Sequence, residues 1–303
     1  MDFLVTGRKI VPKIGETSSM NIKLYFTANI QRLLPKHFLS KLTAILAESQ
    51  RIWLKNFLIR SFIKIYKIDL SEVENPDVSF YPSFNEFFTR RLSANARKCD
   101  MHNRSITSPV DGSISQIGQI QKNKILQAKG ITYSVERLVG CKEVARTFYE
   151  ANFATIYLSP RNYHRVHAPC DSKLIKTCYF HGDIYSVNKK TCDTIPNLFT
   201  RNERLVCYFT SPNFGDFCLI FVGAMLVRGI ETVWSECERS QNFAYEYNSF
   251  SEKNLLFKKG EELGCFKYGS TVILLFTPRF LWLENLTSGT SLRMGERIAL
   301  CNQ

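Results

Sequence analysis

The sequence has no apolar stretch long enough to cross a bilayer. Its longest run without a polar residue, Cys218–Val227, is far shorter than the about 20 residues that a membrane-spanning helix needs. The N-terminal residues MDFLVTGRKIVPKIGE contain no continuous apolar segment, so they resemble neither a secretory signal nor, at all closely, a transit peptide. We therefore expect neither an integral membrane protein nor a secreted one, whereas a protein bound to a membrane surface is compatible with the sequence.

Several functional motifs are also missing. The 10 cysteines form no Cys-x-x-Cys pair, which argues against a cysteine zinc site and indicates free thiols in a reducing cytoplasm. The nucleophile elbow Gly-x-Ser-x-Gly does not occur, nor does an RNA-binding, zinc-finger or Gly-rich basic signature. A cysteine metal centre and a nucleic-acid-binding module are therefore not expected.

The chain carries a net charge of +13, and most of it lies at one end. Residues 1–68 hold 12 Lys and Arg against 3 Asp and Glu, a net charge of +9, while residues 69–303 hold 28 against 24. A concentrated basic segment favours an anionic partner, either nucleic acid or anionic lipid. Solvated helix faces would have the same composition.

Apolar residues recur at helical spacing in 24–34, 36–47 and 51–67. In the last segment Trp53, Leu54, Phe57, Leu58, Phe62, Ile65 and Tyr66 make a wide apolar face, with Arg51, Lys55, Arg60, Lys64 and Lys67 among them. Basic amphipathic helices with Trp and Phe are typical of elements that lie in a membrane interface. The alternative is that the helices simply pack on the rest of the protein.

The remainder of the chain reads as β-rich. One more helix is expected at 84–97, and then short β-branched and aromatic runs alternate with turns such as Asp111-Gly112 and Lys259-Gly260. These runs are SISQIGQI, FATIYL, LVCYFT, FCLIFVGAMLV and TVILLF. We predict an α+β fold, with N-terminal amphipathic helices in 1–75 and a mostly antiparallel β-rich core in 76–303.

Three segments contain residue types that can do chemistry. The first is Asp111 in Ser-Pro-Val-Asp-Gly, although an Asp in a tight turn usually only shapes the turn. The second holds His164 and His167, which an extended segment would place on opposite faces. The third is Ser270 in a Gly-Ser turn before a buried strand. Together they offer an orienting acid, a base and a nucleophile, but the spacing does not say which reaction follows.

From about residue 30 to the end, the sequence resembles the phosphatidylserine decarboxylases. The similarity rests on seven segments that occur together in order, and this joint occurrence is far more specific than any one of them. They are FNEFFTRRL (84–92), SPVDGSIS (108–115), YHRVHAP (163–169), HGDIYSVN (181–188), NERLV (202–206), VGAMLV (222–227) and GCFKYGSTVILLF (264–276).

The resemblance implies a pyruvoyl-dependent enzyme made as a proenzyme that cuts itself between Gly269 and Ser270. Ser270 would attack the carbonyl of Gly269, with His167 as base and Asp111 orienting the imidazole. β-Elimination would then leave a covalent pyruvoyl group at position 270, on a fragment 270–303 that stays attached to fragment 1–269.

The implied reaction converts phosphatidylserine to phosphatidylethanolamine and CO2. The pyruvoyl carbonyl would form a Schiff base with the substrate amine and act as electron sink, with His164 serving the decarboxylation step. No metal or external cofactor is implied. The basic helices would hold the enzyme, as a monomer or a homodimer, on the cytoplasmic face of the cell membrane.

Two positions depart from the family pattern. Tyr268 precedes the expected cut where many members have Leu or Gly, and Ser172 stands where a Gly is usual. If the turn at Ser172 needed a positive φ, the residue would be strained.

Three other functions stay open on the residues alone. A pyruvoyl decarboxylase of a soluble amino acid would share the fold but not the membrane-binding helices. An uncut Ser-His-Asp hydrolase would show esterase activity, and a lipid-binding protein would show neither cleavage nor catalysis.

Overall fold

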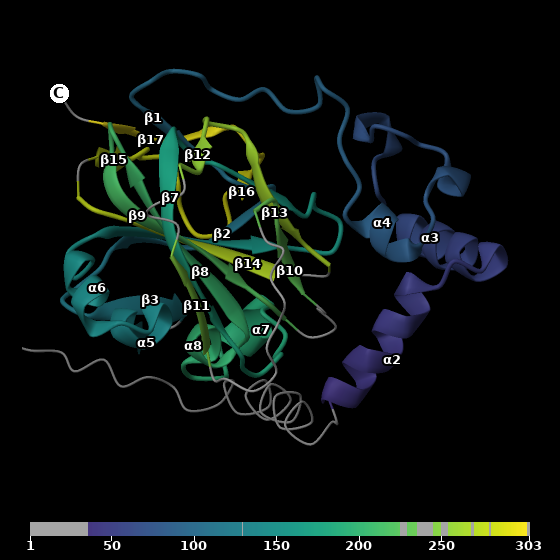
Figure 1. Ribbon diagram of the computed structural model, residues 1–303, viewed down its shortest axis with the longest axis horizontal. Helices are drawn as coiled ribbons and strands as arrows, with labels where there is room; N and C mark the ends of the chain where they lie inside the picture. Colours follow the sequence, from purple (N-terminus) through teal and green to yellow (C-terminus); the bar gives the residue numbers. More distant parts are fainter. Residues whose placement is uncertain are drawn as a thin grey trace, which may run out of the picture. The chain divides into compact units, whose positions relative to one another are not determined.

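The structure is a computed structural model, and it describes residues 36–128, 130–224, 229–234, 245–249, 254–267, 270–278 and 280–301. Of residues 36–41 and 245–248 only the backbone is described. Figure 1 shows the β-sheets together in one part of the molecule and helices α2, α3 and α4 beside them.

A nine-stranded antiparallel sheet forms the centre of the core, in the order β11-β7-β8-β9-β14-β5-β2-β16, with β12 also paired to β7. β14 (Ser270–Phe276) lies in the middle, between β9 (Gly215–Val222) and β5 (Asn152–Leu158), and all of its residues are buried. Its unbroken apolar sequence is what a strand covered on both faces requires. The other strands are β2 (Gly112–Gln119), β7 (Ser172–Phe180), β8 (Arg204–Ser211), β11 (Tyr245–Ser249), β12 (Leu256–Phe257) and β16 (Ser291–Leu292).

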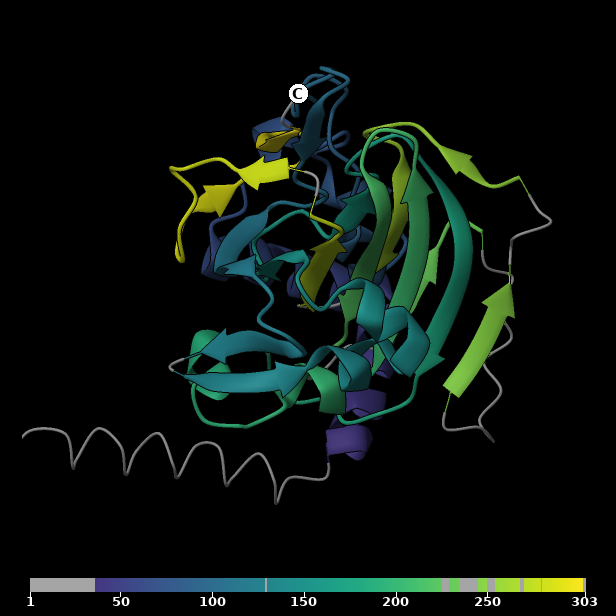
Figure 2. The ribbon, with the colours of Figure 1, turned by 90° about the vertical axis from the view of Figure 1, so that its left-hand side faces the viewer.

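Smaller elements surround this sheet. Figure 2 shows the β3–β4 hairpin and short helices gathered beyond one end of it. The smaller sheets are β1 (Ser105–Thr107), β17 (Arg297–Cys301) and β15 (Phe280–Trp282); β10 (Ile230–Thr232), β13 (Glu262–Phe266) and β6 (Arg165–His167); and β3 (Lys124–Ala128) with β4 (Ile131–Ser134). The short helices are α5 (Val135–Val139), α6 (Lys142–Thr147), α7 (Lys189–Cys192) and α8 (Leu198–Arg201).

The helical region has an apolar cluster of its own. It consists of α2 (Lys36–Glu48), α3 (Ile52–Tyr66), the short helices η1 (Leu70–Glu72) and η2 (Val78–Phe80), and α4 (Phe84–Phe88). Phe62 of α3 packs with its ring centroid 5.2 Å from that of Phe84 and 5.7 Å from that of Phe88. The cluster extends from Ala47 to Phe88 and so crosses residue 75, where the predicted domain boundary falls. That boundary stays a prediction.

The α+β fold is confirmed, as are the helices at 36–47 and 51–67 and the five strands expected from their apolar runs. The helix expected at 84–97 is wrong beyond its first turn, since α4 ends at Phe88. Thr89 turns its hydroxyl back to the carbonyl of Asn85, and Leu92 pairs with Val73 instead of continuing the helix. The helix expected at 24–34 and the end of the β9 segment, 225–227, lie outside the described residues.

The wide apolar face predicted for 51–67 is partly buried and partly exposed. Phe62 is buried against α4, whereas Trp53 and Phe57 are 68% and 64% exposed. Lys55, expected on the basic surface, is 5% exposed, and its Nζ donates to Oδ1 of Asn56 at 2.9 Å. None of the helices among the described residues has the length and apolar character needed to cross a membrane.

Candidate active site

β5 ends and β14 begins at the same end of the large sheet. β5 ends at Leu158, and its register partner is Ser270, the first residue of β14. A turn after Leu158 leads into β6, which pairs with β13, the strand before β14. The N–H of Phe266 donates to the carbonyl of His164 at 3.0 Å. The topology therefore brings His164 and Ser270 to one corner of the core.

His167, in β6, has both ring nitrogens hydrogen-bonded. Nδ1 lies 2.8 Å from the carbonyl oxygen of Gly260, which can only accept, so Nδ1 carries the proton. Nε2 then accepts from the hydroxyl of Tyr163 at 3.1 Å. Burial lowers the pKa of His167, which favours the neutral ring. The side chain is therefore held as a neutral imidazole whose lone pair is on Nε2.

Asp111 reaches this region from the loop before β2, where the N–H of His167 donates to the carbonyl of Pro109 at 2.9 Å. Its Oδ1 accepts from Arg97 Nε and from the N–H of Met294, both at 2.8 Å, and its Oδ2 accepts from Arg97 Nη2 at 2.5 Å. Among the described residues, no hydrogen bond joins Asp111 to His167. The structure thus places the two on adjacent segments, with the carboxylate turned to Arg97, and the predicted orienting role stays a prediction.

His164 is fully buried, and neither of its ring nitrogens has a hydrogen-bond partner in the described part of the chain. Its ring centroid lies 4.1 Å from that of Phe88. Burial, helped by the positive charge of Arg90, lowers the pKa of His164 to about 3. A buried neutral imidazole whose nitrogens have no hydrogen-bond partner among the described residues can receive a polar group of a ligand.

The hydroxyl of Ser270 is buried as well. Neither its Oγ nor the Oγ1 of Thr271 has a partner among the described residues. Tyr268 and Gly269 lie outside the described residues, so the geometry of the expected cleavage bond is not described. A buried hydroxyl without a partner is costly, and such groups are common where chemistry or a ligand completes them.

Two glycines near these residues adopt backbone positions that other residues could not easily take. Gly260 has a φ of +84°, a left-handed conformation that side chains rarely adopt, and this turn presents its carbonyl to His167. A Cβ at Gly112 would lie 2.6 Å from the carbonyl oxygen of Tyr157 on β5. The turn Asp111-Gly112 therefore needs glycine because β5 lies too close for a side chain, and the turn Lys259-Gly260 needs glycine because of its positive φ. Ser172 begins β7 and is not among the non-glycine residues with positive φ, so no strain follows from it.

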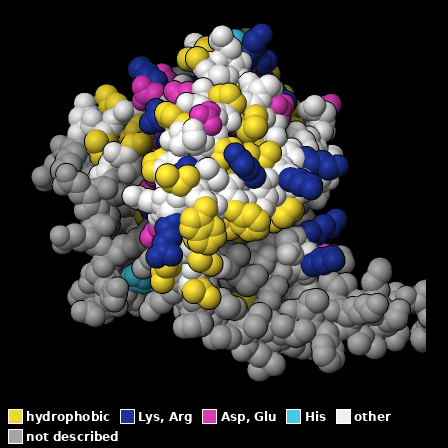
Figure 3. Space-filling model, turned by 90° about the vertical axis from the view of Figure 1, so that its right-hand side faces the viewer, with side chains coloured by type: hydrophobic (Ala, Val, Ile, Leu, Met, Phe, Trp, Pro, Cys, Tyr) yellow, Lys and Arg dark blue, Asp and Glu magenta, His cyan; other side chains and the backbone are white. Residues whose placement is uncertain are grey.

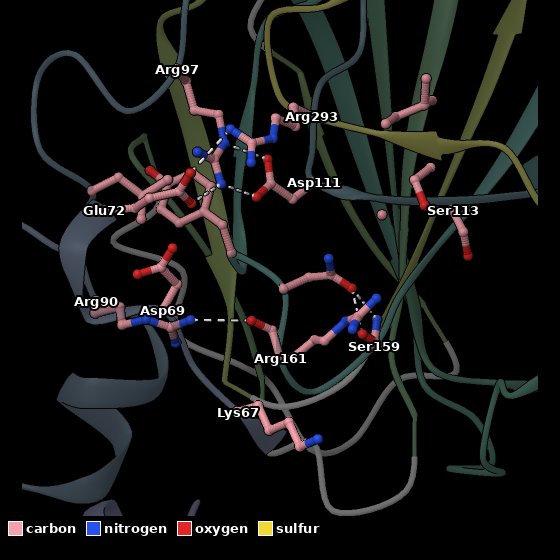
Figure 4. A pocket seen from close by; sticks show the side chains of 16 residues that line it. Lys67, Asp69, Glu72, Arg90, Arg97, Asp111, Ser113, Ser159, Arg161 and Arg293 are labelled. Carbon is pink, nitrogen blue, oxygen red and sulfur yellow. Dashed lines mark hydrogen bonds and ion pairs between the residues drawn. The ribbon is translucent and has the colours of Figure 1, made fainter. Parts of the chain in front are cut away.

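A cavity of about 450 Å³ opens beside the corner, lined by five Lys or Arg and three carboxylates (Figure 4). Arg97 lies between two of the carboxylates, with its Nη2 3.0 Å from Glu72 and 2.5 Å from Asp111. Arg293 binds the other oxygen of Glu72 at 3.0 Å. This network joins the helical region, through η1, to the β core.

Sequence reasoning missed four contributors to this site: Tyr163, Gly260, Arg97 and Arg90. Tyr163 and Arg90 belong to the segments YHRVHAP and FNEFFTRRL, so a signal was present, but neither residue type announces its role alone. Gly260 acts through its carbonyl, which no sequence motif reports. Among the described residues, no group of three or more His, Cys, Asp or Glu is placed to hold a metal ion.

Comparison with known proteins agrees with this architecture. The family model "Phosphatidylserine decarboxylase" matches residues 84–300, and a second model, "PSD", matches 26–67. The β-rich core is therefore that of a decarboxylase, and the chain belongs to the phosphatidylserine decarboxylase family.

Similar full-length proteins carry the same family name. The phosphatidylserine decarboxylase proenzyme of Aliivibrio fischeri is 42% identical over 287 residues, which is 93% of this chain and 98% of that protein. The proenzyme of Ectopseudomonas mendocina is 44% identical over 271 residues, 88% of this chain and 94% of that protein. That of Alcanivorax borkumensis is 44% identical over 280 residues, 91% and 95% of the two. The similarity thus includes the helical region as well as the core.

Proposed function

We propose that this chain is a self-processing phosphatidylserine decarboxylase. It is made as a proenzyme, cuts itself before Ser270, and converts phosphatidylserine to phosphatidylethanolamine and CO2. The observation that carries the proposal is a buried serine hydroxyl that has no hydrogen-bond partner among the described residues, on a segment near two neutral histidines, in a chain of this family. The ring of His164 is fully buried, and its nitrogens have no hydrogen-bond partner in the described part of the chain, so it can interact with a substrate bound to a reactive group at position 270.

The cut uses the serine as nucleophile. As Oγ of Ser270 bonds to the carbonyl carbon of Gly269, its proton passes to Nε2 of His167, and the amine released from the broken peptide bond takes a proton. Loss of the Cα proton and cleavage of the Cβ–Oγ bond then free the carboxylate of Gly269. Water hydrolyses the remaining enamine to a pyruvoyl group and ammonia. Nε2 is the basic nitrogen because the Nδ1 proton is held by Gly260.

A pyruvoyl group at position 270 would supply an electrophilic carbonyl that binds the substrate amine and accepts the electron pair released with CO2. His164 receives the substrate carboxylate. Because its pKa is about 3, the ring stays neutral and does not compensate the carboxylate charge, and the adjacent Phe88 excludes water. Both effects favour loss of the charge as CO2.

The cut does not separate the two fragments in this proposal. Fragment 270–303 contributes β14 to the middle of the large sheet, β16 to its edge beside β2, and β17 to the smaller sheet beside β1. Since β14 is buried along its whole length, removing it would expose the centre of the core. The mature enzyme is therefore two chains held in shared sheets.

The exposed face of α3 suits an anionic membrane surface, as expected for a peripheral protein on the cytoplasmic face of the cell membrane. Trp53, Phe57 and Ile65 are more than 60% exposed there, and Arg60 and Lys64 are exposed beside them. Figure 3, which looks at this side of the molecule, shows hydrophobic side chains gathered with Lys and Arg around them. An apolar surface rimmed by cations matches an interfacial element.

Mass spectrometry of the purified protein tests the proposal. We expect two fragments, 1–269 and 270–303, with a pyruvoyl group at position 270, and CO2 release from phosphatidylserine vesicles but not from free serine. Ser270→Ala should remain one chain because no hydroxyl is left to form the ester, while the exposed Ser288→Ala serves as a matched control that cuts normally. An uncut parent with esterase activity would support a hydrolase instead.

A further inference from the structure

One buried arginine at the cavity forms no salt bridge with any residue that the structure describes. The side chain of Arg90 is 4% exposed, and its Nη2 donates to the carbonyl of Arg161 at 3.2 Å. Its Nε and Nη1 have no hydrogen-bond partner in the described part of the chain. Burial lowers the pKa of Arg90 to about 10, so the guanidinium is still charged at neutral pH. A desolvated charge with two free donors is costly unless an anion completes it.

The carboxylates that line the cavity are already engaged. Arg97 binds two of them, Glu72 and Asp111. The third, Asp69, accepts from the N–H of Ser71 at 2.9 Å and from its hydroxyl at 2.7 Å. None of the three forms a salt bridge to Arg90 among the described residues.

Two more cations stand at the rim. Lys67 follows α3 in a left-handed conformation, with a φ of 52°, which ends the helix beside the cavity. Arg161 lies in the turn after β5 and is also exposed. Neither has an ion pair with a carboxylate that the structure describes. The residues that line the cavity therefore include one buried and two exposed positively charged side chains, and Figure 4 shows all three around it.

The cavity begins next to the proposed reaction centre. Leu158 is the register partner of Ser270, and the following residue, Ser159, lines the cavity. Tyr163, which donates to His167, lines it as well. An anion in the cavity can therefore belong to the same molecule as a group bound at position 270.

We propose that this cavity binds the phosphate group of the phospholipid headgroup, with Arg90 as its buried ligand and Lys67 and Arg161 at its rim. The inference rests on the proposed function, and it names the site that would let the enzyme bind a phosphate-containing substrate in preference to free serine. An arginine on the substrate carboxylate would stabilise the charge that must leave as CO2. The phosphate keeps its charge throughout the reaction, so it is the group that the cations suit, while the carboxylate meets neutral His164.

Thermal unfolding of the uncut Ser270→Ala chain tests binding without catalysis. We expect inorganic phosphate and glycerophosphoserine to raise the melting temperature above that in chloride at equal ionic strength, and free serine not to. Arg90→Met should abolish this rise without lowering the melting temperature in chloride, since it removes an unpaired buried charge. Arg91→Met, a change at the exposed neighbouring arginine, should keep the rise.

Kinetics of the matured enzyme with a short-chain, water-soluble phosphatidylserine give the second readout. Arg90→Met should cut itself normally and show a KM raised between about 10-fold and 100-fold, with a smaller change in kcat, because one charge-assisted contact to the phosphate is lost. Arg90→Lys should recover part of the loss. Inorganic phosphate should inhibit the parent competitively and the variant less.

An Arg90→Met enzyme with the parent's KM and the parent's phosphate response would overturn the inference. Stabilisation by inorganic phosphate but not by glycerophosphoserine would also overturn it, as a site for free phosphate only. If Arg90→Met does not fold, the double variant Lys67→Gln/Arg161→Gln replaces it, and an unchanged phosphate response there is equally contrary. A parent that binds glycerophosphoserine yet never cuts or decarboxylates would instead overturn the proposed function.

Discussion

Arg97 donates two parallel hydrogen bonds to the carboxylate of Asp111, from Nε to Oδ1 and from Nη2 to Oδ2. Both side chains are almost completely buried, at 7% and 6% exposure. The same guanidinium reaches Glu72 of η1, so one arginine ties the Asp111 loop to the helical region. The acid that sequence reasoning assigned to the histidine is thus fixed in place by an arginine.

Removing that arginine should leave a buried carboxylate unpaired. We expect Arg97→Gln to lower the free energy of unfolding of the uncut Ser270→Ala chain by about 3 kcal/mol. Denaturant unfolding measures this, with Arg293→Gln, whose side chain is 60% exposed, as a control that should change it by less than about 1 kcal/mol. Equal effects from the two arginines would mean that the pair with Asp111 is not the stabilising contact.

The two histidines should separate maturation from catalysis. His167→Ala should leave the chain largely uncut, as should Asp111→Ala, because the serine loses its base or the group expected to support it. His164→Ala should mature and then decarboxylate at least about 100-fold more slowly, since general acid–base and positioning groups contribute on this order. Gel analysis and CO2 release measure the two steps. Cleavage that is blocked in His164→Ala and normal in His167→Ala would reverse the assignments.

The buried imidazole of His164 makes stability depend on pH. Its pKa is lowered from 6.5 to about 3, so below 6.5 the unfolded chain binds a proton that the folded chain does not. His164 therefore takes nothing from the free energy of unfolding above about pH 6.5, and it lowers that free energy as the pH falls from 6.5 toward 3. Between pH 7 and pH 5 this ring should cost about 2 kcal/mol of unfolding free energy.

Urea unfolding of the uncut Ser270→Ala chain at the two pH values measures this loss. His164→Gln in the same background should show a difference between pH 7 and pH 5 that is smaller by about that amount. A variant whose pH dependence equals the parent's would show that His164 takes up a proton in the folded state.

Membrane binding should have two separable parts. Arg60→Gln/Lys64→Gln should weaken binding to anionic vesicles at low salt, because each cation near the surface contributes on the order of 1 kcal/mol. Trp53→Ser/Phe57→Ser should weaken the part that survives at high salt. Vesicle sedimentation at two salt concentrations measures both, and self-cleavage should be normal in each variant. Lys55 is left intact because it is buried.

The spacing of apolar residues along the sequence predicts most of the longer helices and strands. The runs TVILLF and LVCYFT predict buried strands, and the 3.6-residue repeat predicts α2 and α3, because burial of these side chains decides their structure. The end of α4 was not predictable, since Thr89 and Leu92 leave the helix to meet partners elsewhere in the chain. Short strands such as β6 and β13 likewise depend on pairing between distant segments.

For the site, the motifs name the candidate residues but do not predict their contacts. β5 pairs with β14 and β6 pairs with β13, and because β6 follows β5 and β14 follows β13 in the chain, the segments that carry His164, His167 and Ser270 come to the same end of the large sheet. The partners of His167 came from elsewhere: a backbone carbonyl at Gly260 and the hydroxyl of Tyr163. Residue identity does not encode a carbonyl's direction, so this geometry is visible only in three dimensions.

The place of β14 in the middle of the sheet also affects whether the mature protein can refold once it has unfolded. Before the cut, unfolding and refolding are events within one molecule, and the chain returns to its fold at a rate independent of dilution. After the proposed cut before Ser270, the central strand would belong to a separate 34-residue peptide, 270–303. Refolding would then become a second-order encounter that slows with dilution. The enzyme would persist because its sheet opens slowly, so its lifetime is set by an unfolding rate instead of an equilibrium.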